Sequence, residues 1–268
     1  MQDAIATSGG GWQSLARVGP AIPIAMALPR TPEPELMDGA EQVEAYASAD
    51  FEASDQAMVE RLAHLCGHDP GPQLADLGCG PGNISFRLAR RWPAAQVLGL
   101  DGAPRMLAIA EQRLAAEPEL AGRLHFQEAL LPLPESAPLP ATFRAGCFSA
   151  VLSNSLLHHL HDPLGLWQAV AQLGAPGAFV YVQDLRRPPS AAAVEELVAA
   201  AMADAPEVLR RDYRASLHAA FSPAEVAAQL QQAGLGGLQV ASLGDCYLEV
   251  WGRLTARCDA GTTAPAAP

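Results

Sequence analysis

Short apolar runs alternate with amphipathic stretches along the middle of the chain. The apolar runs lie at 73–77, 95–100, 124–127, 148–153 and 178–183. They are brief and almost continuously apolar, as expected for strands that are covered on both faces. Amphipathic helices are predicted between them, at 82–91, 104–116 and 163–173. This alternation of strand and helix predicts an α/β fold around a mostly parallel sheet.

Further elements are predicted on both sides of this core. Residues 42–65 carry apolar side chains at helical spacing, which predicts a helical lid. Helices at 191–203 and 223–233 precede strands near 237–242 and 247–252. We expect one domain over 39–255, between a flexible leader at 1–38 and a disordered tail at 256–268, because both ends are rich in small residues and proline.

A glycine-rich turn follows the first predicted strand. Asp76 is followed by Gly78, Gly80 and Gly82, each separated by one residue. Such glycines let the backbone turn sharply and approach a ligand, and the helix that follows offers unpaired N–H groups. Asp101 ends the second strand, at the separation where an acidic residue meets ribose hydroxyls. The pattern therefore predicts a site for a nucleotide-like cofactor.

The turn differs from a dinucleotide fingerprint, because Asn83 stands where G-x-G-x-x-G requires its third glycine. The spacing Asp76-x-Gly78-x-Gly80-x-Gly82 resembles instead the cofactor motif of class I S-adenosylmethionine-dependent methyltransferases. Segments 99–106, 126–132, 148–163 and 174–184 fit this family in the same order, so the resemblance covers roughly residues 40–252. It implies a doubly wound, mostly parallel, seven-stranded Rossmann-like sheet with an antiparallel C-terminal edge hairpin.

The resemblance also implies the residues that hold S-adenosylmethionine and its product S-adenosylhomocysteine. Asp76 and the backbone of 78–82 would hold the methionyl part, and Asp101 the ribose. The remaining expected contacts are Gly102, Met106, Glu128 and the Ala129 N–H around adenine, Asn154 near the methionyl amino group or the sulfonium, and Tyr46 from the lid. Solvation or helix capping is the alternative interpretation for Asp101 and Glu128, and core packing for Met106 and Tyr46.

Three histidines, His158, His159 and His161, lie where the family exposes a loop toward the acceptor. A neutral imidazole is the natural base near pH 7, so His158 and His159 are the candidate catalytic residues, with structural framing of the site as the alternative. His161 belongs to a sequence typical of a turn and helix start, with Asp162 as the N-cap. No metal site is predicted, because adjacent loop residues rarely converge and no cysteine or carboxylate stands at a supporting spacing.

Two arginines, Arg186 and Arg187, follow the fifth strand and Asp184. Their guanidinium groups would suit a carboxylate or phosphate on the acceptor, and solvation of a loop or pairing with Asp184 is the alternative. Tyr213, within a charged run at 209–214, is a candidate to stack on the acceptor or hydrogen-bond to it, or else belongs to a charged helix face.

Composition limits the partners. The net charge of -12 and the pI near 4.9 disfavour binding to a nucleic-acid backbone, and no apolar run is long enough to span a bilayer. The five cysteines lack metal or disulfide spacing, which favours a reducing cytoplasm. We expect a cytoplasmic monomer or homodimer that methylates a small molecule. The two arginines are the reason to consider an anionic one.

The acceptor atom is left open among O, N, C and S. The segment from Ser153 to Leu156 replaces the Asn-Pro-Pro-Tyr signature of adenine and amide N-methylation, so nucleic-acid bases are less expected acceptors. Two other classes of function stay open from the sequence. One is a non-catalytic binder that keeps the cofactor pocket, and the other is a nicotinamide-dependent oxidoreductase on a related sheet.

Overall fold

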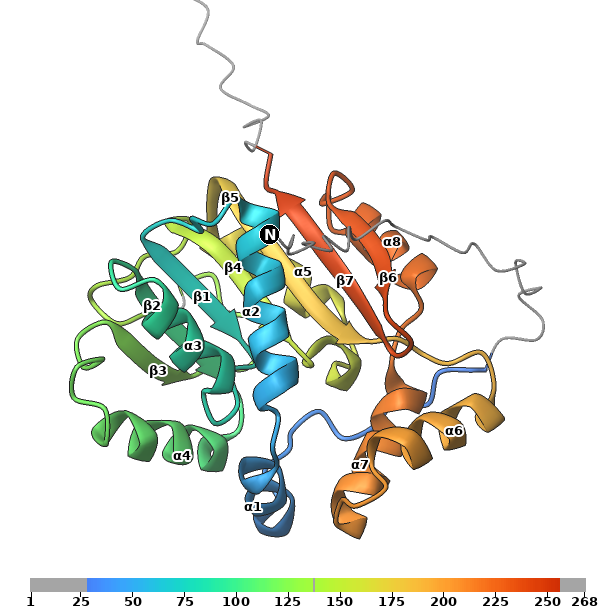
Figure 1. Ribbon diagram of the computed structural model, residues 1–268. Coiled ribbons are helices and arrows are strands. Elements are labelled where there is room, and N and C mark those ends of the chain that lie inside the picture. The colour runs from blue at the N-terminus through green and yellow to red at the C-terminus, as the bar shows by residue number, and fades with distance from the viewer. Residues whose placement is uncertain (1–27, 137, 256–268) are drawn as a thin grey trace, which may run out of the picture.

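The computed structural model describes residues 28–136 and 138–255, which form a sheet covered by helices (Figure 1). Its seven strands lie in the order β3-β2-β1-β4-β5-β7-β6. Their bounds are β1 (Gln73–Leu77), β2 (Gln96–Asp101), β3 (Leu124–Glu128), β4 (Phe148–Asn154), β5 (Gly174–Leu185), β6 (Gln239–Leu243) and β7 (Tyr247–Arg253). Strands β1 to β5 pair in parallel, and β7 is antiparallel to both β5 and β6. The predicted sheet is confirmed, with β7 inserted between β5 and the edge strand β6.

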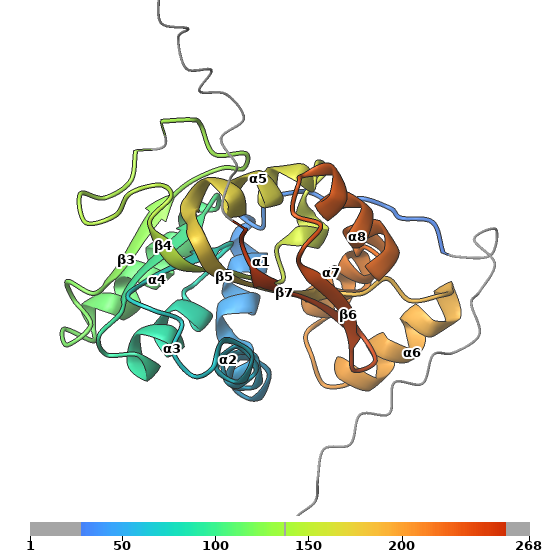
Figure 2. The same cartoon turned by 90° about the horizontal axis from the view of Figure 1, so that it is seen from above.

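Helices cover both faces of this sheet. They are α1 (Ala40–Ser48), α2 (Glu52–Cys66), α3 (Asn83–Arg91), α4 (Pro104–Ala115), α5 (Leu164–Leu173), α6 (Ala191–Ala201), α7 (Glu207–Ala219) and α8 (Pro223–Gln232), with a 3₁₀ turn η2 (Leu157–His159). Figure 2 shows α2 and α3 on one face and α5 and α8 on the other. None of these described helices has the length and apolar character needed to cross a bilayer.

The helical predictions need two corrections. The stretch 42–65 is not one helix, because the chain leaves helical geometry at 49–51 and so divides into α1 and α2. The run 209–214 lies in helix α7, in agreement with the alternative of a charged helix face, but the bounds of this helix were not predicted, because charged residues separate its buried apolar positions, Val208 and Leu217.

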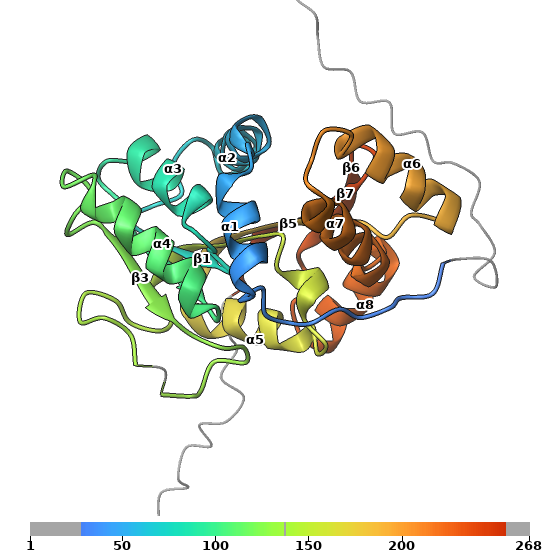
Figure 3. The same ribbon diagram turned by 90° about the horizontal axis from the view of Figure 1, so that it is seen from below.

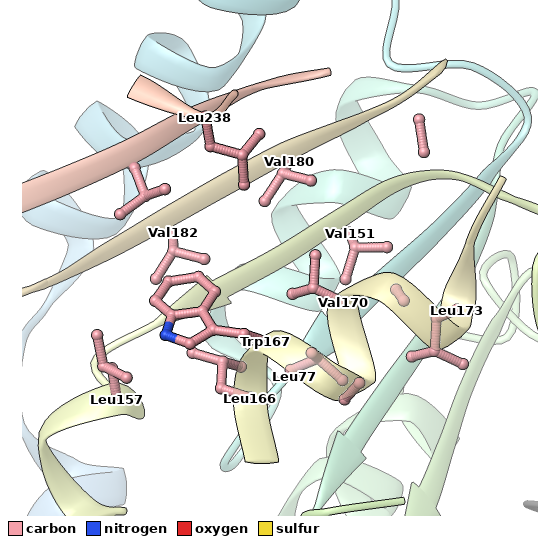
Figure 4. Packing of buried hydrophobic residues seen from close by; sticks show 14 of the residues in the cluster. Leu77, Val151, Leu157, Leu166, Trp167, Val170, Leu173, Val180, Val182 and Leu238 are labelled. Carbon is pink, nitrogen blue, oxygen red and sulfur yellow. The ribbon is translucent and has the colours of Figure 1, made fainter. Parts of the chain in front are cut away.

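The core fixes where those strand ends lie. Trp167 of α5 is fully buried against the sheet, and its indole N–H donates to Gln229 of α8 at 3.0 Å. Figure 4 shows Val180 and Val182 of β5 facing this helix. Burying such side chains contributes roughly 1.5–3 kcal/mol each, so β4 and β5 form a rigid platform.

The chain reverses its winding beside β1, which has β2 on one side and β4 on the other. Ligands of open α/β sheets bind at such a point, beyond the carboxyl ends of the strands. Figure 1 shows α1, α6 and α7 gathered at this end of the molecule.

Residues 28–38 cross the same end of the sheet, from α7 to α1 (Figure 3). Thr31 N–H donates to His218 O at 3.0 Å, and the Arg30 guanidinium donates to three backbone carbonyls, of Ala219, His158 and Leu160. The prediction of a flexible leader up to residue 38 is therefore wrong for 28–38, because these residues pack on the domain. The predictions for 1–27 and for the tail from 256 lie outside the described residues.

Candidate active site

Two cavities open beyond the ends of β1 and β4 and share a wall. The loop cavity lies beside the glycine turn, and the lid cavity, of about 730 Å³, lies among α1, α2, α6, α7 and the start of β7. Six residues line both cavities: Met37, Tyr46, Asp55, Asn154, Ser155 and His159. We call these the junction residues.

The glycine turn needs glycine for conformation at Gly78 and Gly80, whose φ values are +70° and +53°. A Cβ atom at Gly78 would lie 2.8 Å from the Leu156 side chain, so the turn and the β4 loop pack closely. At Gly80 the same atom would meet none of the described residues within 4 Å, and this glycine lines the loop cavity. The turn therefore leaves the space of a side chain to a ligand.

The amide groups of the turn do not face the cavity, which corrects the expected role of its N–H groups. Gly78 and Cys79 donate to Leu100 O at 2.8 and 3.1 Å, and Gly80 donates to Asp101 Oδ2 at 2.7 Å. Gly82 donates to Cys79 O, is not among the residues lining the loop cavity, and packs against two phenylalanine rings. The turn can offer a ligand its carbonyl oxygens and its open surface, but not these donors.

Asp76 and Asp101 both line the loop cavity, as predicted. Asp76 is fully buried and accepts a hydrogen bond from Ser85 Oγ at 2.6 Å; burial raises its pKa to about 7. Burial also raises the pKa of Asp101, against the pull of N–H groups such as Ala103 N at 2.7 Å. A cationic ligand group would favour the ionised form of Asp76.

The other predicted cofactor residues divide into two groups. Tyr46, Gly102, Met106 and Asn154 line the loop cavity. Glu128 and Ala129 do not, although Glu128 ends β3 next to Asp101. The Ala129 N–H is already used, because it donates to Asp101 O at 2.9 Å. The expected adenine contact of that N–H is thus corrected to a bond between strands.

His158 is buried between two carboxylates. Its Nδ1 lies 2.7 Å from Asp184 Oδ1, and its Nε2 lies 3.6 Å from Glu33 Oε1. Burial opposes the charged ring, but the attraction and hydrogen bond of Asp184, joined by the charge of Glu33, outweigh it and raise the pKa. His158 lines the lid cavity, and both of its ring nitrogens face carboxylates, so its role as a base stays a prediction beside the alternative of framing the site.

The pKa of His159 is shifted in the opposite direction to that of His158. Burial, with the charge of His158, holds its pKa well below the ordinary value, so the ring is neutral near pH 7. Its Nδ1 lies 3.3 Å from Glu33 Oε1. The ligand atoms of Glu33, His158 and His159 lie within 4.8 Å of one another and could hold a metal ion, so the argument that no carboxylate supports these histidines was wrong. Sequence spacing could not show this, because Glu33 arrives from the segment 28–38.

The two predicted acceptor arginines lie outside the lid cavity, which corrects that prediction. Arg186 donates to the carbonyls of Gly244, Asp245 and Tyr247, and so holds the β6–β7 turn. Arg187 donates to Ala220 O at 2.9 Å and to Glu225 at 2.7 Å.

Asp184 is the third residue of this region that was predicted to contact the acceptor. Its carboxylate pairs with the His158 ring and also accepts the Leu157 N–H at 2.7 Å. It too is absent from the lining of the lid cavity, whereas Tyr213 does line it. His161 lies at the surface, where its ring contacts Glu33 O, and Asp162 accepts the Leu164 N–H at the start of α5.

The lid cavity is acidic and aromatic. Its carboxylates are Asp50, Asp55, Asp204 and Asp212, its aromatic rings are Tyr46, Phe51, Tyr213 and Tyr247, and none of its described lining residues is Lys or Arg. Asp55 was not predicted as a site residue. A signal for it existed, because Asp55 shares the buried face of α2 with Met58, Val59 and Leu62, where an aspartate is unexpected.

The end of β4 carries the remaining junction features. Ser155 has a φ of +56°, a left-handed backbone that is uncommon outside glycine, and its N–H donates to Gln183 O at 2.9 Å. The neighbouring Asn154 Oδ1 is buried without a hydrogen-bond partner among the described residues. Strain and an unpaired polar atom both mark the place where the two cavities meet.

Comparisons with known proteins agree with this geometry. A family model described as a methyltransferase domain matches residues 74–177. A ubiquinone biosynthesis O-methyltransferase from Xanthomonas axonopodis pv. citri is 30% identical over 197 residues, which are 70% of this chain and 73% of that protein. A trans-aconitate 2-methyltransferase from Methylobacterium radiotolerans is 40% identical over 113 residues, which are 42% of this chain and 38% of that protein.

Solved structures show the same fold. A methyltransferase from Aquifex aeolicus matches with a TM-score of 0.56 at 15% identity, covering 79% of this chain and 97% of that one. The plantazolicin methyltransferase BpumL, solved with S-adenosylhomocysteine and a monoazolic desmethylPZN analog, matches with a TM-score of 0.61 at 11% identity, covering 81% of this chain and 91% of that one.

The sheet order and the loop cavity define an S-adenosylmethionine-dependent methyltransferase fold. The chain belongs to the class I S-adenosylmethionine-dependent methyltransferases, and it is an enzyme that uses this cofactor. The alternatives of a nicotinamide-dependent oxidoreductase and a non-catalytic binder are thereby set aside.

Proposed function

We propose that the enzyme moves a methyl group from S-adenosylmethionine in the loop cavity to a small molecule in the lid cavity. The observation that carries this proposal is the shared wall of six junction residues, since it brings the two cavities together at the end of β4. When bound, the cofactor supplies a methyl group on a positively charged sulfur.

The residues of the loop cavity fit this cofactor. Asp76 is a buried carboxylate that accepts a hydrogen bond from Ser85, which suits the amino group of the methionyl part. Asp101 accepts hydrogen bonds from backbone N–H groups of 80, 102 and 103, and a carboxylate can accept further bonds, which suits ribose hydroxyls. Gly102, Ala103 and Met106 provide a small, apolar surface for the adenine ring.

The protein's main contribution is alignment in a space with little water. Helices α1 and α2 and the segment 28–38 cover the junction, with Met37 and Tyr46 lining both cavities. The segment is held there by Arg30, which donates to His158 O at 3.0 Å. Of the two predicted catalytic histidines, His159 is the one at the junction, and we assign His158 to positioning Glu33 and Asp184.

The acceptor that fits the lid cavity is mainly apolar and is not an anion. Carboxylates and aromatic rings line the cavity, and Arg186 and Arg187, which had favoured an anion, lie elsewhere. An anion would meet like charge in this space without compensation. The cytoplasmic location, the absence of nucleic-acid and membrane partners and the monomeric or homodimeric state stay predictions.

Calorimetry on the purified full-length chain tests the first half of the proposal. We expect micromolar binding of S-adenosylmethionine and S-adenosylhomocysteine and no signal with NAD. A screen of neutral, cationic and anionic aromatic acceptors for S-adenosylhomocysteine formation tests the second half. Absence of cofactor binding would overturn the proposal, and turnover confined to anionic acceptors would overturn the assignment of the lid cavity.

A further inference from the structure

The lid cavity carries one carboxylate whose surroundings match a particular acceptor group. We propose that the acceptor is an amine, and that Asp55 binds its ammonium group at the junction and takes the proton that the nitrogen loses. This inference rests on the proposed function, because it takes the acceptor to occupy the lid cavity.

Asp55 lies in the first turn of α2 and is 6% exposed, yet it lines both cavities. Its Oδ2 has no hydrogen-bond partner among the described residues. The nearest cation, Arg87 Nη1, lies 3.7 Å from that oxygen, which is beyond hydrogen-bond distance, and Arg87 pairs more closely with Glu52, at 2.5 Å. A buried carboxylate oxygen without a donor is costly, so a ligand that brings an N–H group is favoured here.

The other carboxylates of the lid cavity are engaged or lie farther out. Asp212 accepts a hydrogen bond from Gln42 at 2.8 Å and pairs with Arg211 at 3.0 Å. Asp50 accepts the Glu52 N–H at the start of α2, and Asp204 is exposed. Asp55 is therefore the buried carboxylate of this cavity that is left to bind a cation, and the others add a negative field that attracts one.

Aromatic rings complete the surroundings of a cation. Tyr46 is a junction residue, and Phe51, Tyr213 and Tyr247 line the same cavity. Tyr46 and Phe51 pack together with ring centroids 4.8 Å apart. Ring faces attract ammonium groups, including methylated ones, so this wall suits the substrate and the product alike.

The groups around Asp55 also suit a proton acceptor. Burial raises its pKa to about 6, against the pull of Arg87 and of a hydrogen bond from Asn83, while Glu52 pushes in the same direction as burial. The other titratable groups that act on it electrostatically are Tyr46 on α1, Asp76 at the end of β1 and Tyr247 on β7. Asp55 is thus ionised at neutral pH but close enough in pKa to hold a proton during turnover.

The proton and electron balance is simple. The ammonium group gives one proton to the Asp55 carboxylate, which leaves a neutral amine with a free electron pair. That pair forms the new N–C bond as the C–S bond breaks, and the electrons of the C–S bond stay on sulfur in S-adenosylhomocysteine. The product nitrogen carries the positive charge, and the proton on Asp55 passes to water, so each turnover releases one proton.

The test measures binding to the cofactor-free protein, so that it does not depend on turnover. The probes form matched sets, each with an amine, an alcohol and a carboxylate on the same aromatic group. One set is tryptamine, indole-3-ethanol and indole-3-acetate, and further sets carry a benzyl or a phenethyl group. We expect at least one amine to bind about tenfold or more tightly than its alcohol and its carboxylate, as a charge-assisted hydrogen bond predicts. This preference should weaken as the pH falls through about 6.

Two variants of α2 sharpen the test. Asp55→Asn keeps the shape of the side chain but loses the charge, and should reduce the preference for the amine to about twofold or less. Glu52→Gln is the matched control, because Glu52 also pairs with Arg87 but is exposed and does not line the lid cavity. It should keep the preference. Because Asp55→Asn removes a buried charge, its melting temperature at pH 8 should not fall.

The possible outcomes separate this inference from the proposed function. Cofactor binding without a preference for any amine would overturn the inference alone, whereas loss of cofactor binding in the unaltered protein would overturn the proposed function. If Asp55→Asn weakened S-adenosylmethionine binding as strongly as amine binding, Asp55 would belong to the cofactor site and the inference would fail. Methylation of the alcohol in preference to the amine would also contradict it.

Discussion

The loop cavity and the lid cavity meet at six residues but are built in different ways. The loop cavity is made mainly from the short segments that follow β1 and β2, which are neighbours in the sheet and close in the sequence. The lid cavity draws on α1, α2, α6, α7 and β7, which span residues 37–247. The first depends on backbone shape, and the second on which side chains the helices bring together.

This difference teaches where a sequence is informative. A glycine turn and a carboxylate at a strand end can be recognised in the sequence, because both follow a short strand directly. A cavity between helices has no such local rule, because its chemistry depends on helix packing. Substitutions in the two cavities should therefore differ in their effects.

The largest effect is expected from Gly78→Val. A Cβ atom at Gly78 would lie 2.8 Å from Leu156 at a φ of +70°, so the turn must move. The cost of about 3 kcal/mol corresponds to a loss of cofactor affinity of 100-fold or more, measured by calorimetry. Gly67→Val is the control, because Gly67 has a φ of +79° and none of the described residues lies within 4 Å of its added Cβ. It should leave the dissociation constant unchanged.

Asp101→Ala should weaken S-adenosylmethionine binding by on the order of 1–3 kcal/mol, through the loss of charge-assisted hydrogen bonds to the ribose. The same carboxylate accepts Gly80 N–H and Ala103 N–H, so part of the loss comes from a loosened turn. The dissociation constant of the folded variant for S-adenosylmethionine, measured by calorimetry, tests this expectation. An unchanged value would contradict the assignment of the loop cavity.

The pH dependence of cofactor binding should follow Asp76. Burial raises the pKa of Asp76 to about 7, so its carboxylate is mostly ionised only above that pH. Only the ionised form can pair with a cationic amino group. Affinity should therefore be about tenfold higher at pH 8 than at pH 6. In Asp76→Asn the affinity should be lower and this dependence should flatten, apart from the ligand's own titration, which both proteins share. Equal slopes in the two proteins would exclude Asp76 as the cause.

His158 should make stability depend on pH. Its folded pKa is raised, so its contribution is fully present below the unfolded pKa of 6.5 and is lost as the pH rises through the folded pKa. The melting temperature of the unaltered protein should exceed that of His158→Gln by more at pH 6 than at pH 8.5. We expect the difference in melting temperature between the two proteins to change by about 2–4 °C between these pH values. A change of about 1 kcal/mol in the free energy of unfolding would produce such a shift. A constant difference would mean that the pKa of His158 is the same in the folded and the unfolded protein.

The smallest effect is expected from Arg186→Ala. Its guanidinium holds backbone carbonyls of the β6–β7 turn and lies outside the lid cavity. The KM for an acceptor should change by less than about twofold, within the range of a surface substitution, because the turn is exposed. A rise in KM of tenfold with unchanged kcat would restore the arginine to the acceptor site and break the contrast between the two cavities.

Much of the fold was predictable, for physical reasons that can be named. β1 was predicted with its observed bounds, 73–77, and β2 to within one residue at each end, because buried parallel strands are continuously apolar. For α7 only a charged helix face at 209–214 was considered, and its bounds were missed because its buried residues are separated by charged ones. The leader escaped prediction because residues 28–38 lack periodicity and are held by hydrogen bonds and contacts to distant elements, such as Arg30 to Ala219 O.

The sequence by itself determined the sheet, the glycine turn and the carboxylates Asp76 and Asp101, because these depend on local backbone geometry and on the ends of adjacent strands. Which polar groups share a space depends on the tertiary structure. It places Asp55 at the junction with an Oδ2 that has no hydrogen-bond partner among the described residues, brings Glu33 to the histidines and leaves Arg186 and Arg187 outside the lining of the lid cavity. The charge that a cavity offers depends on contacts between distant segments, and no local pattern encodes them.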